Sequence, residues 1–149
     1  MARRDLVRMT VDEIAEFLAE PHLCTIGTHG LRGTIHLVAM NYGFLDDSPA
    51  FWSYRKSQKI RNLERDLSIS MLVHSGFDYA QLRGVQIAGR AEIRDDIERV
   101  RAVADSMASR YGAGVTSTSA RESIAKRVAV RIVVDEVVSW DHTKLGGAY

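Results

Sequence analysis

Residues 51–66 read FWSYRKSQKIRNLERD and join a short aromatic strand to a basic helical segment through a Ser-x-Lys pair. Ser57 offers a hydroxyl donor and Lys59 a compact cation. The amides at the start of the following helix add free N–H groups and the positive end of the helix dipole. All three features attract an anion to one place, so the segment predicts a binding site for an anionic ligand, with phosphate as the natural match.

Two simpler explanations of this segment stay open from the residues alone. Ser57 can cap the following helix with its hydroxyl, and Lys59 and Arg61 can lie on a face that water covers. Arg55 and Lys56 fit contacts with a phosphate or an acidic extension as well as they fit ordinary surface charge. The position of these side chains in the fold decides between the explanations.

Strand patterns surround this segment on both sides. Alternating apolar residues and turn signals predict strands over residues 23–28, 34–44, 50–54, 69–75, 85–93, 127–134 and 137–140. The strand over 34–44 is apolar on both faces, so protein or ligand should cover both of them. The composition of residues 46–49, DDSP, predicts a turn.

Two longer helices are predicted besides the one after Ser57. Thr10 and Glu13 form a capping box in front of a helix over Val11–Ala19. A second helix should start at Asp95-Asp96 and end at Gly112, followed by a small-residue loop over 112–119. The buried stripe of that helix is predicted to consist of Ile97, Val100, Ala104, Met107 and Tyr111.

The gaps between most strands are too short for a parallel crossover, which favours antiparallel pairing. Closing such a sheet removes its exposed edges. We therefore predict a mainly β, α+β fold: a closed or nearly closed antiparallel barrel of about six strands with helices outside. One domain should span all 149 residues.

Composition limits the classes of partner. Basic and acidic residues nearly cancel, at a net charge of +1, so no broad basic face is available for nucleic acid. Cys24 is the only cysteine, which excludes an internal disulfide and fits a reducing compartment. No histidine pair has metal-ligand spacing. With no signal-peptide pattern and no membrane-spanning apolar run, we expect a cytoplasmic protein, and at this size a homodimer that forms its pocket between subunits.

Several short strings occur in order and at consistent spacing along nearly the whole chain. They are Gly33 to Met40 with Tyr42, Ser57-Gln58-Lys59 with Asn62-Leu63, Tyr79 with Leu82-Arg83-Gly84-Val85, and Ser139-Trp140-Asp141-His142 with Lys144-Leu145-Gly146. In these strings the chain resembles the split-barrel flavin-binding family that contains pyridoxamine 5'-phosphate oxidase. Within that family it looks most like the actinobacterial deazaflavin-dependent oxidoreductases that use the cofactor F420.

The resemblance implies a six-stranded antiparallel split β-barrel of the FMN-binding type and a set of cofactor contacts. The cofactor's ring system would lie along the strand of Val38, Ala39, Met40 and Asn41, mostly against backbone groups. Ser53 and Tyr54 would flank the ribityl chain, and Ser57, Gln58 and Lys59 would hold the phosphate. The wall contributed by the second subunit of a dimer would come from Trp140, His142 and Lys144.

These features lead to a functional hypothesis: an F420-dependent oxidoreductase that transfers a hydride between the deazaflavin and an unsaturated or conjugated small organic substrate. Extra cations at Arg55, Lys56 and Arg61 favour F420, with its acidic tail, over FMN. Two alternatives stay open: an FMN-dependent oxidase or reductase of the pyridoxamine phosphate oxidase type, and a protein that binds a cofactor or haem without turnover. Tyr42, Tyr79 and His142 are candidate proton donors. Hydrolase chemistry is not supported, because the Asp141-His142 pair has no nucleophile in a suitable motif.

Overall fold

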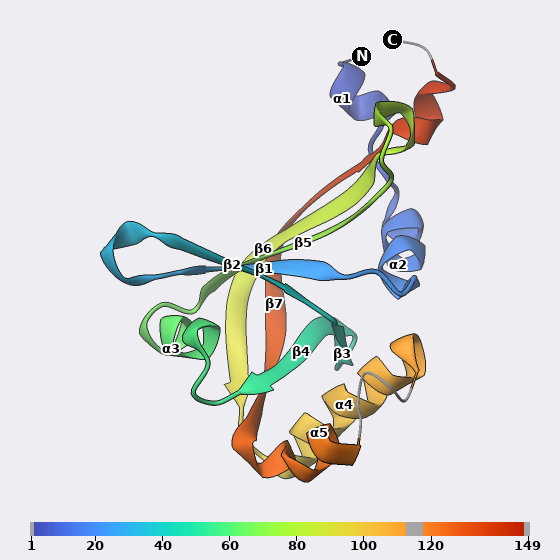
Figure 1. The fold of residues 1–149 in the computed structure, drawn as a ribbon. Coiled ribbons are helices and arrows are strands. Elements are labelled where there is room, and N and C mark those ends of the chain that lie inside the picture. Colours follow the sequence, from blue (N-terminus) through green and yellow to red (C-terminus); the bar gives the residue numbers. More distant parts are fainter. Residues whose placement is uncertain (1, 113–117, 148–149) are drawn as a thin grey trace.

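The computed structural model describes residues 2–112 and 118–147, which form one antiparallel sheet with helices around it (Figure 1). The strands are β1 Cys24–His29, β2 Ile35–Met40, β3 Gly43–Leu45, β4 Ser48–Tyr54, β5 Ser68–Ser75, β6 Arg83–Arg94 and β7 Arg127–Asp141. The α-helices are α1 Arg3–Leu6, α2 Val11–Ala19, α3 Gln58–Arg65, α4 Ile97–Tyr111 and α5 Thr118–Glu122, and the 3-10 helices are η1 Leu31–Gly33, η2 Tyr79–Gln81, η4 Ile124–Lys126 and η5 His142–Leu145.

The sheet has the strand order β2-β1-β5-β6-β7-β4-β3, so its two edge strands are neighbours in the sequence. This arrangement corrects the prediction of one strand over 34–44, because the chain breaks at Asn41 and Tyr42. Tyr42 turns inward there, is fully buried, and donates its hydroxyl to the carbonyl of Leu18. If β2 and β3 are counted as one bent strand, the seven strands become the predicted six. The sheet is a half-barrel, and the predicted split-barrel class is confirmed.

The prediction of two separate strands over 127–134 and 137–140 is wrong, because these residues form one long strand, β7. The pairing with β6 shifts between Ala88 and Gly89, and Asp135 has no partner in the ladder. An extra residue of this kind is a β-bulge, and it reverses the alternation of apolar and polar side chains. Gly89 is required at the bulge, because a Cβ atom there would collide with the Val133 carbonyl.

The helices agree well with their capping signals. Thr10 accepts from the Glu13 amide while Glu13 accepts from the Thr10 amide, as the predicted capping box requires. Asp96 caps α4. Ile97 is 48% exposed, contrary to prediction, because it lies in the first turn beyond the core. Residues 113–117 of the predicted loop lie outside the described residues, and α5 begins at Thr118.

The turn predicted over 46–49 is confined to Asp46 and Asp47, which both adopt positive φ in a tight hairpin. Pro49 already belongs to β4. Proline has no N–H to donate to the sheet, and near the start of a strand the loss of this hydrogen bond is tolerated.

Two apolar clusters flank β4. Phe51 faces the main core inside the half-barrel, with Phe17, Tyr42 and Met71. Trp52 faces the second cluster, under α4, with Met107. Both faces of β4 are therefore buried, which fixes the strand firmly before it reaches the Ser-x-Lys segment.

One face of the sheet stays uncovered in the single chain. Ile35 and Leu37 on β2 are 56% and 65% exposed, and Val133, Val134 and Val137 on β7 are also exposed. The prediction that protein or ligand covers both faces of β2 is thus not met within one chain. No described helix is long and apolar enough to cross a membrane.

Candidate functional site

A cavity of about 330 Å³ lies where the half-barrel is split. β3 pairs with β4 only along Ser48–Ala50, so β4 beyond Ala50 pairs only with β7. β2, at the other end of the sheet, pairs only with β1. Strand edges of this kind leave backbone N–H and C=O groups without ladder partners. The cavity is lined by Val38, Ala39, Met40, Asn41, Trp52, Ser53, Tyr54, Lys59, Met107 and Arg127.

Seven of the predicted site residues meet at this cavity: Val38, Ala39, Met40, Asn41, Ser53, Tyr54 and Lys59. The first four come from the end of β2 and the residue after it, and Ser53 and Tyr54 from the end of β4. Lys59 comes from the first turn of α3. Residues from three elements, up to 21 positions apart in the sequence, thus share one concave surface.

Ser53, Ser57 and Lys59 form a hydrogen-bonded cluster. The Lys59 Nζ donates to Ser53 Oγ at 3.0 Å, and the Ser53 and Ser57 hydroxyls lie 2.9 Å apart. Ser57 occupies the N-cap position of α3, yet its side chain accepts no hydrogen bond from the helix amides. The capping explanation of Ser57 therefore does not apply, and the first amides of α3 keep their donors.

Arg127, the first residue of β7, also lines the cavity, and sequence reasoning missed it. Its guanidinium carbon lies 4.2 Å from the centre of the Trp52 ring and 4.0 Å from that of Tyr54. Its Nε donates to Ser123 Oγ at 3.2 Å. The strand register, which pairs Tyr54 with Arg127, places it there. No local motif signals such a pairing between residues 73 positions apart in the sequence.

The cavity carries positive charge without a matching carboxylate. Within residues 2–112 and 118–147, neither Lys59 nor Arg127 forms an ion pair. Burial lowers the pKa of Lys59, and the charge of Arg127 lowers it further. The Ser123 hydroxyl and the Arg127 charge lower the pKa of Tyr54. Because partly buried cations without a counterion are unfavourable, the cavity is suited to an anion.

The remaining cations of the Ser-x-Lys segment lie outside this cavity. Arg55 forms an ion pair with Asp95 at 3.6 Å. Together with Lys56 it lines a second cavity of about 560 Å³, whose other walls are Tyr54, Ala125 and Lys126. Tyr54 belongs to both cavities, so they adjoin. Arg61 is exposed and lines neither.

Gln58 is not at the cavity. Its amide donates to Asn62 Oδ1, and the fully buried Asn62 donates in turn to Thr28 Oγ1. These contacts tie α3 to β1. They hold the helix that carries Lys59 in place.

The C-terminal end of β7, which carries Trp140, and η5, which carries His142 and Lys144, lie at the opposite end of the sheet, beside α1 (Figure 1). The Trp140 ring packs on Gly84, where a Cβ atom would collide with it. His142 Nδ1 lies 2.9 Å from the Tyr79 carbonyl, and Lys144 forms an ion pair with Glu13 at 2.6 Å. Within one chain none of the three reaches the cavity, so their contribution to a partner's cavity stays a prediction.

One buried polar atom on β2 has no partner. His36 Nδ1 is buried and is the only such side-chain atom among the described residues. His36 shares a face of β2 with Val38 and Met40, which line the cavity. A group placed along this strand edge could supply the missing partner.

Other chemistry finds less support. The described residues contain no cluster of three or more histidine, cysteine or acidic side chains that could hold a metal ion. The Tyr42 hydroxyl is buried, donates to Leu18, and has a pKa raised by burial, so it is not a proton donor for a bound substrate.

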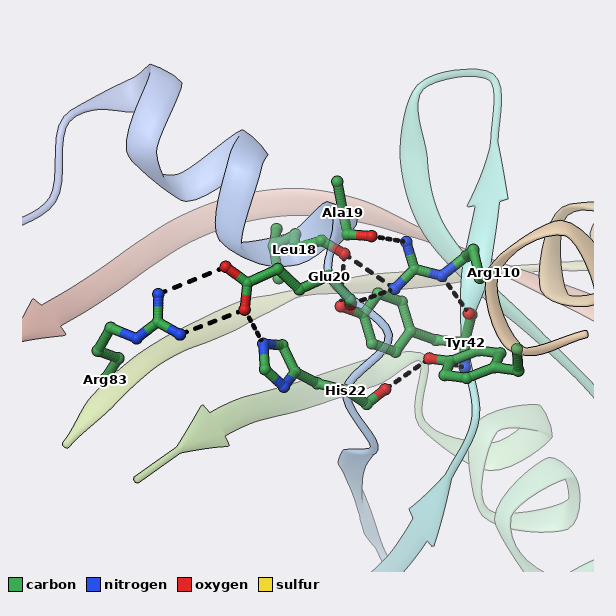
Figure 2. A network of polar contacts seen from close by, with 8 residues as sticks. Leu18, Ala19, Glu20, His22, Tyr42, Arg83 and Arg110 are labelled. Atoms are coloured by element: carbon green, nitrogen blue, oxygen red, sulfur yellow. Dashed lines mark hydrogen bonds and ion pairs between the residues drawn. The ribbon is translucent and has the colours of Figure 1, made fainter. Parts of the chain in front are cut away.

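A second polar network lies away from the cavity, between α2 and α4 (Figure 2). Arg110 donates to the carbonyls of Leu18, Ala19, Glu20 and Tyr42 at 2.9 to 3.2 Å. Its guanidinium carbon also lies 4.4 Å from the centre of the Tyr42 ring. The network thus joins the end of α2 to α4.

Arg83 completes this network from β6. It pairs with Glu20 at 3.2 Å, and His22 Nε2 contacts the same carboxylate at 2.7 Å (Figure 2). The structure gives Arg83 a salt bridge within the chain.

Comparison with known proteins places these features in context. The family model described as "Pyridoxamine 5'-phosphate oxidase" matches residues 10–141. No functionally curated protein matches the chain significantly. The crystal structure of a conserved hypothetical protein from Mycobacterium tuberculosis is 37% identical, with a TM-score of 0.89, over 100% of this chain and 95% of that one.

Two further solved structures show that the fold serves different ligands. An F420 reductase shares 21% identity at a TM-score of 0.67, over 82% of this chain and 93% of that one. A haem-binding protein from Mycobacterium smegmatis shares 19% identity at a TM-score of 0.67, over 93% of this chain and 60% of that one. At these identities the two structures establish the common fold and nothing finer.

Proposed function

The chain belongs to the pyridoxamine 5'-phosphate oxidase family, and from this premise we propose that its split cavity binds coenzyme F420 and that the protein is an F420-dependent oxidoreductase. The observation that carries the proposal is the cluster of Ser53, Ser57 and Lys59. Lys59, a cation without an ion pair among the described residues, and the Ser53 hydroxyl line the cavity. The Ser57 hydroxyl does not line it but lies 2.9 Å from the Ser53 hydroxyl, at the start of α3. This combination is suited to a phosphate group.

The second cavity supports F420 over FMN. The phosphate of FMN ends its chain, whereas the phosphate of F420 is a diester that continues into an acidic tail. A diester needs an exit from the phosphate site. The cavity beyond Tyr54, with Arg55, Lys56 and Lys126 on its walls, offers both an exit and positive charge.

The residues along β2 fit a flat ring system. Val38 and Met40 present apolar surface, and the unpaired edge of the strand offers backbone donors and acceptors. The buried, unpartnered His36 Nδ1 lies on the same face. A ring held here would be fixed by the strand and would displace water from the apolar side chains.

In this proposal the chain's residues bind and orient rather than react. Lys59 and the serine hydroxyls hold the phosphate, and the β2 edge sets the ring in one plane, which fixes its distance from a substrate. Bound F420 supplies the hydride chemistry, and the substrate is an unsaturated or conjugated small organic molecule. The described residues around the cavity include no arranged acid–base pair, and hydride transfer at a positioned cofactor does not need one.

A homodimer fits the exposed apolar face. A groove of about 330 Å³ runs over small residues of β1, β5 and β6, including Gly27, Ser70 and Ala88, and Ile35 and Leu37 form one wall. A second copy would cover these side chains and bring the far end of its own sheet, with Trp140 and His142, toward the cavity. Sedimentation of the purified protein tests this state.

The test of function is a cofactor titration of protein purified from a host that lacks F420. Quenching of F420 fluorescence at micromolar protein, with weaker binding of FMN, is the expected result. Turnover is then followed as fluorescence recovery when F420H₂ is oxidised by a panel of conjugated substrates. A yellow protein with stoichiometric FMN favours the FMN-dependent alternative, and binding of haem without either flavin favours the storage alternative.

A further inference from the structure

We infer that Arg127 is a phosphate-binding residue of the cavity, acting together with Lys59, and that it makes the site selective for phosphorylated ligands over their dephosphorylated ribosides. This inference rests on the proposed function for the identity of the ligand. The inference goes beyond the proposed function because it assigns a phosphate contact to a residue outside the Ser-x-Lys motif.

The location follows from the strand register. Arg127 pairs with Tyr54 at the end of β4 and lines the same cavity as Lys59. Its positive charge is close enough to lower the pKa of Lys59. Two cations brought together in a partly enclosed space repel each other, so an anion between or near them would stabilise the arrangement.

Three contacts hold the guanidinium in place. The rings of Trp52 and Tyr54 each lie within about 4 Å of its central carbon, and Nε donates to Ser123. Trp52 is itself anchored in the apolar cluster under α4, so one of the two rings cannot move away. Stacking of this kind fixes the plane of a guanidinium, and the Nε hydrogen bond fixes its rotation.

The terminal nitrogens remain available. Among the described residues, the guanidinium donates to Ser123 through Nε, and a weaker interaction with the Tyr54 hydroxyl contributes to the lowered pKa of that group. No carboxylate among the described residues pairs with the guanidinium. The two terminal NH₂ groups form the fork that matches two oxygens of a phosphate. A fork that is oriented before the ligand arrives loses little entropy on binding.

A purely structural arginine would look different, and Arg110 provides the comparison in the same chain. Arg110 also contacts aromatic rings, but its nitrogens donate to four backbone carbonyls. Arg127 makes the same kind of ring contacts and leaves its terminal donors unused.

The test compares three probes: FMN, riboflavin, which lacks the phosphate, and inorganic phosphate observed by phosphorus NMR. The variants are Arg127→Gln, Arg127→Lys and Arg94→Gln, the last an exposed arginine paired with Glu92 as the matched control. Arg127→Gln should weaken FMN and phosphate binding about 10- to 100-fold, the range for hydrogen bonds to charged groups. Riboflavin binding should change less than about twofold, and Arg94→Gln should bind all probes like the wild type.

Arg127→Lys should recover only part of the loss, because an ammonium group keeps the charge but not the stacked fork. Circular dichroism and thermal unfolding verify that each variant is folded. Equal loss of FMN and riboflavin affinity would show a structural role and overturn the inference, as would unchanged FMN and phosphate binding in Arg127→Gln. If the wild type binds neither FMN nor F420, the proposed function fails. The phosphate probe then judges Arg127 by itself, and a wild type that binds no phosphate overturns this inference too.

Discussion

Arg110 and Arg127 occupy similar surroundings and differ in what their donors meet. Both guanidinium groups lie against buried aromatic rings, Arg110 against Tyr42 of the main core and Arg127 against Trp52 of the second apolar cluster. Arg110 donates to the last carbonyls of α2 and to Tyr42, which closes the end of that helix (Figure 2). The guanidinium of Arg127 donates to Ser123 through Nε and to no backbone carbonyl among the described residues. Guanidinium N–H groups that are hydrogen-bonded within the chain indicate an arginine that stabilises the fold. Guanidinium N–H groups that are held in place but have no acceptor in the chain indicate an arginine that binds a ligand.

The same contrast holds for the two regions around these residues. Between α2 and α4, the donors of Arg110 and Arg83 are matched with carbonyls and a carboxylate of the same chain. At the split, the strand edges lack ladder partners, and Lys59 and Arg127 contact hydroxyls but no carboxylate among the described residues. On the same strand as part of the cavity lining, His36 Nδ1 has no partner. Proteins leave such groups unmatched where a ligand completes them. Four experiments test whether the two regions differ in this way.

The largest effect is expected from Arg110→Ala. The substitution removes donors from the carbonyls of Leu18, Ala19, Glu20 and Tyr42 and the packing over the Tyr42 ring. We expect a loss of about 2–4 kcal/mol in the free energy of unfolding. Arg127→Ala should cost about 1 kcal/mol or less, as an exposed ring contact does. Urea unfolding measures both, and comparable losses in the two variants would contradict the distinction between them.

The next largest effect is on binding. Lys59→Gln should weaken FMN binding about 10- to 100-fold by removing a charged donor from the phosphate site. The unfolding free energy should stay the same or rise, because the variant no longer holds an unpaired, partly buried charge. Arg61 makes a useful control, since it lies on the same helix, is exposed and lines neither cavity. An Arg61→Gln variant that loses as much affinity as Lys59→Gln would count against the assignment.

A smaller effect is expected from pH. Burial and the charge of Arg127 lower the pKa of Lys59, so it loses its proton at a lower pH than an ordinary lysine. Deprotonation removes a positive charge, and the affinity for inorganic phosphate should fall as the pH rises through that lowered value. Arg127→Gln removes the second cause, and the fall should then move to higher pH. Phosphorus NMR titrations across the alkaline range measure both. If the phosphate affinity of Arg127→Gln falls at the same pH as that of the wild type, the two cations are not coupled.

The smallest effect is expected at Glu20, on the matched side of the comparison. Burial raises its pKa, but hydrogen bonds from Arg83 and His22 outweigh burial and lower it overall. A lowered carboxyl pKa stabilises the fold above the pKa of the unfolded chain and loses that contribution as the pH falls through the folded value. Glu20→Gln should therefore cost about 1 kcal/mol or less at neutral pH, since the pair is partly exposed. The difference from the wild type should vanish in acid, and a constant difference in urea unfolding at all pH values would exclude this explanation.

Local signals in the sequence determine much of the fold. The capping box before α2, the cap of α4 and the alternation along β5 and β6 can be read directly, because each depends on neighbours a few residues away. The break between β2 and β3 cannot be read from local signals. Tyr42 turns inward there and donates its hydroxyl to the Leu18 carbonyl, 24 residues away in the sequence. The bulge at Asp135 shifts the alternation of apolar and polar side chains along β7 by one residue. In the sequence, this one continuous strand therefore looks like two strands.

The site divides in the same way. Ser57 and Lys59 follow from a motif within one segment, and the β2 residues from the resemblance to a family. Arg127 has no local signal, since it reaches the cavity through a strand pairing with Tyr54 that the tertiary fold creates. Gln58 matches the motif but contacts Asn62, because the helix turns its side chain away from the cavity.

The most direct test of the account is a crystal structure of the full chain with F420 bound. We expect the phosphate at the split, within hydrogen-bond distance of Lys59 Nζ and of the terminal nitrogens of Arg127, with the ring along the edge of β2. A phosphate found away from both cations, or a ring bound elsewhere on the sheet, would contradict the central claim that the unmatched groups at the split are the cofactor site.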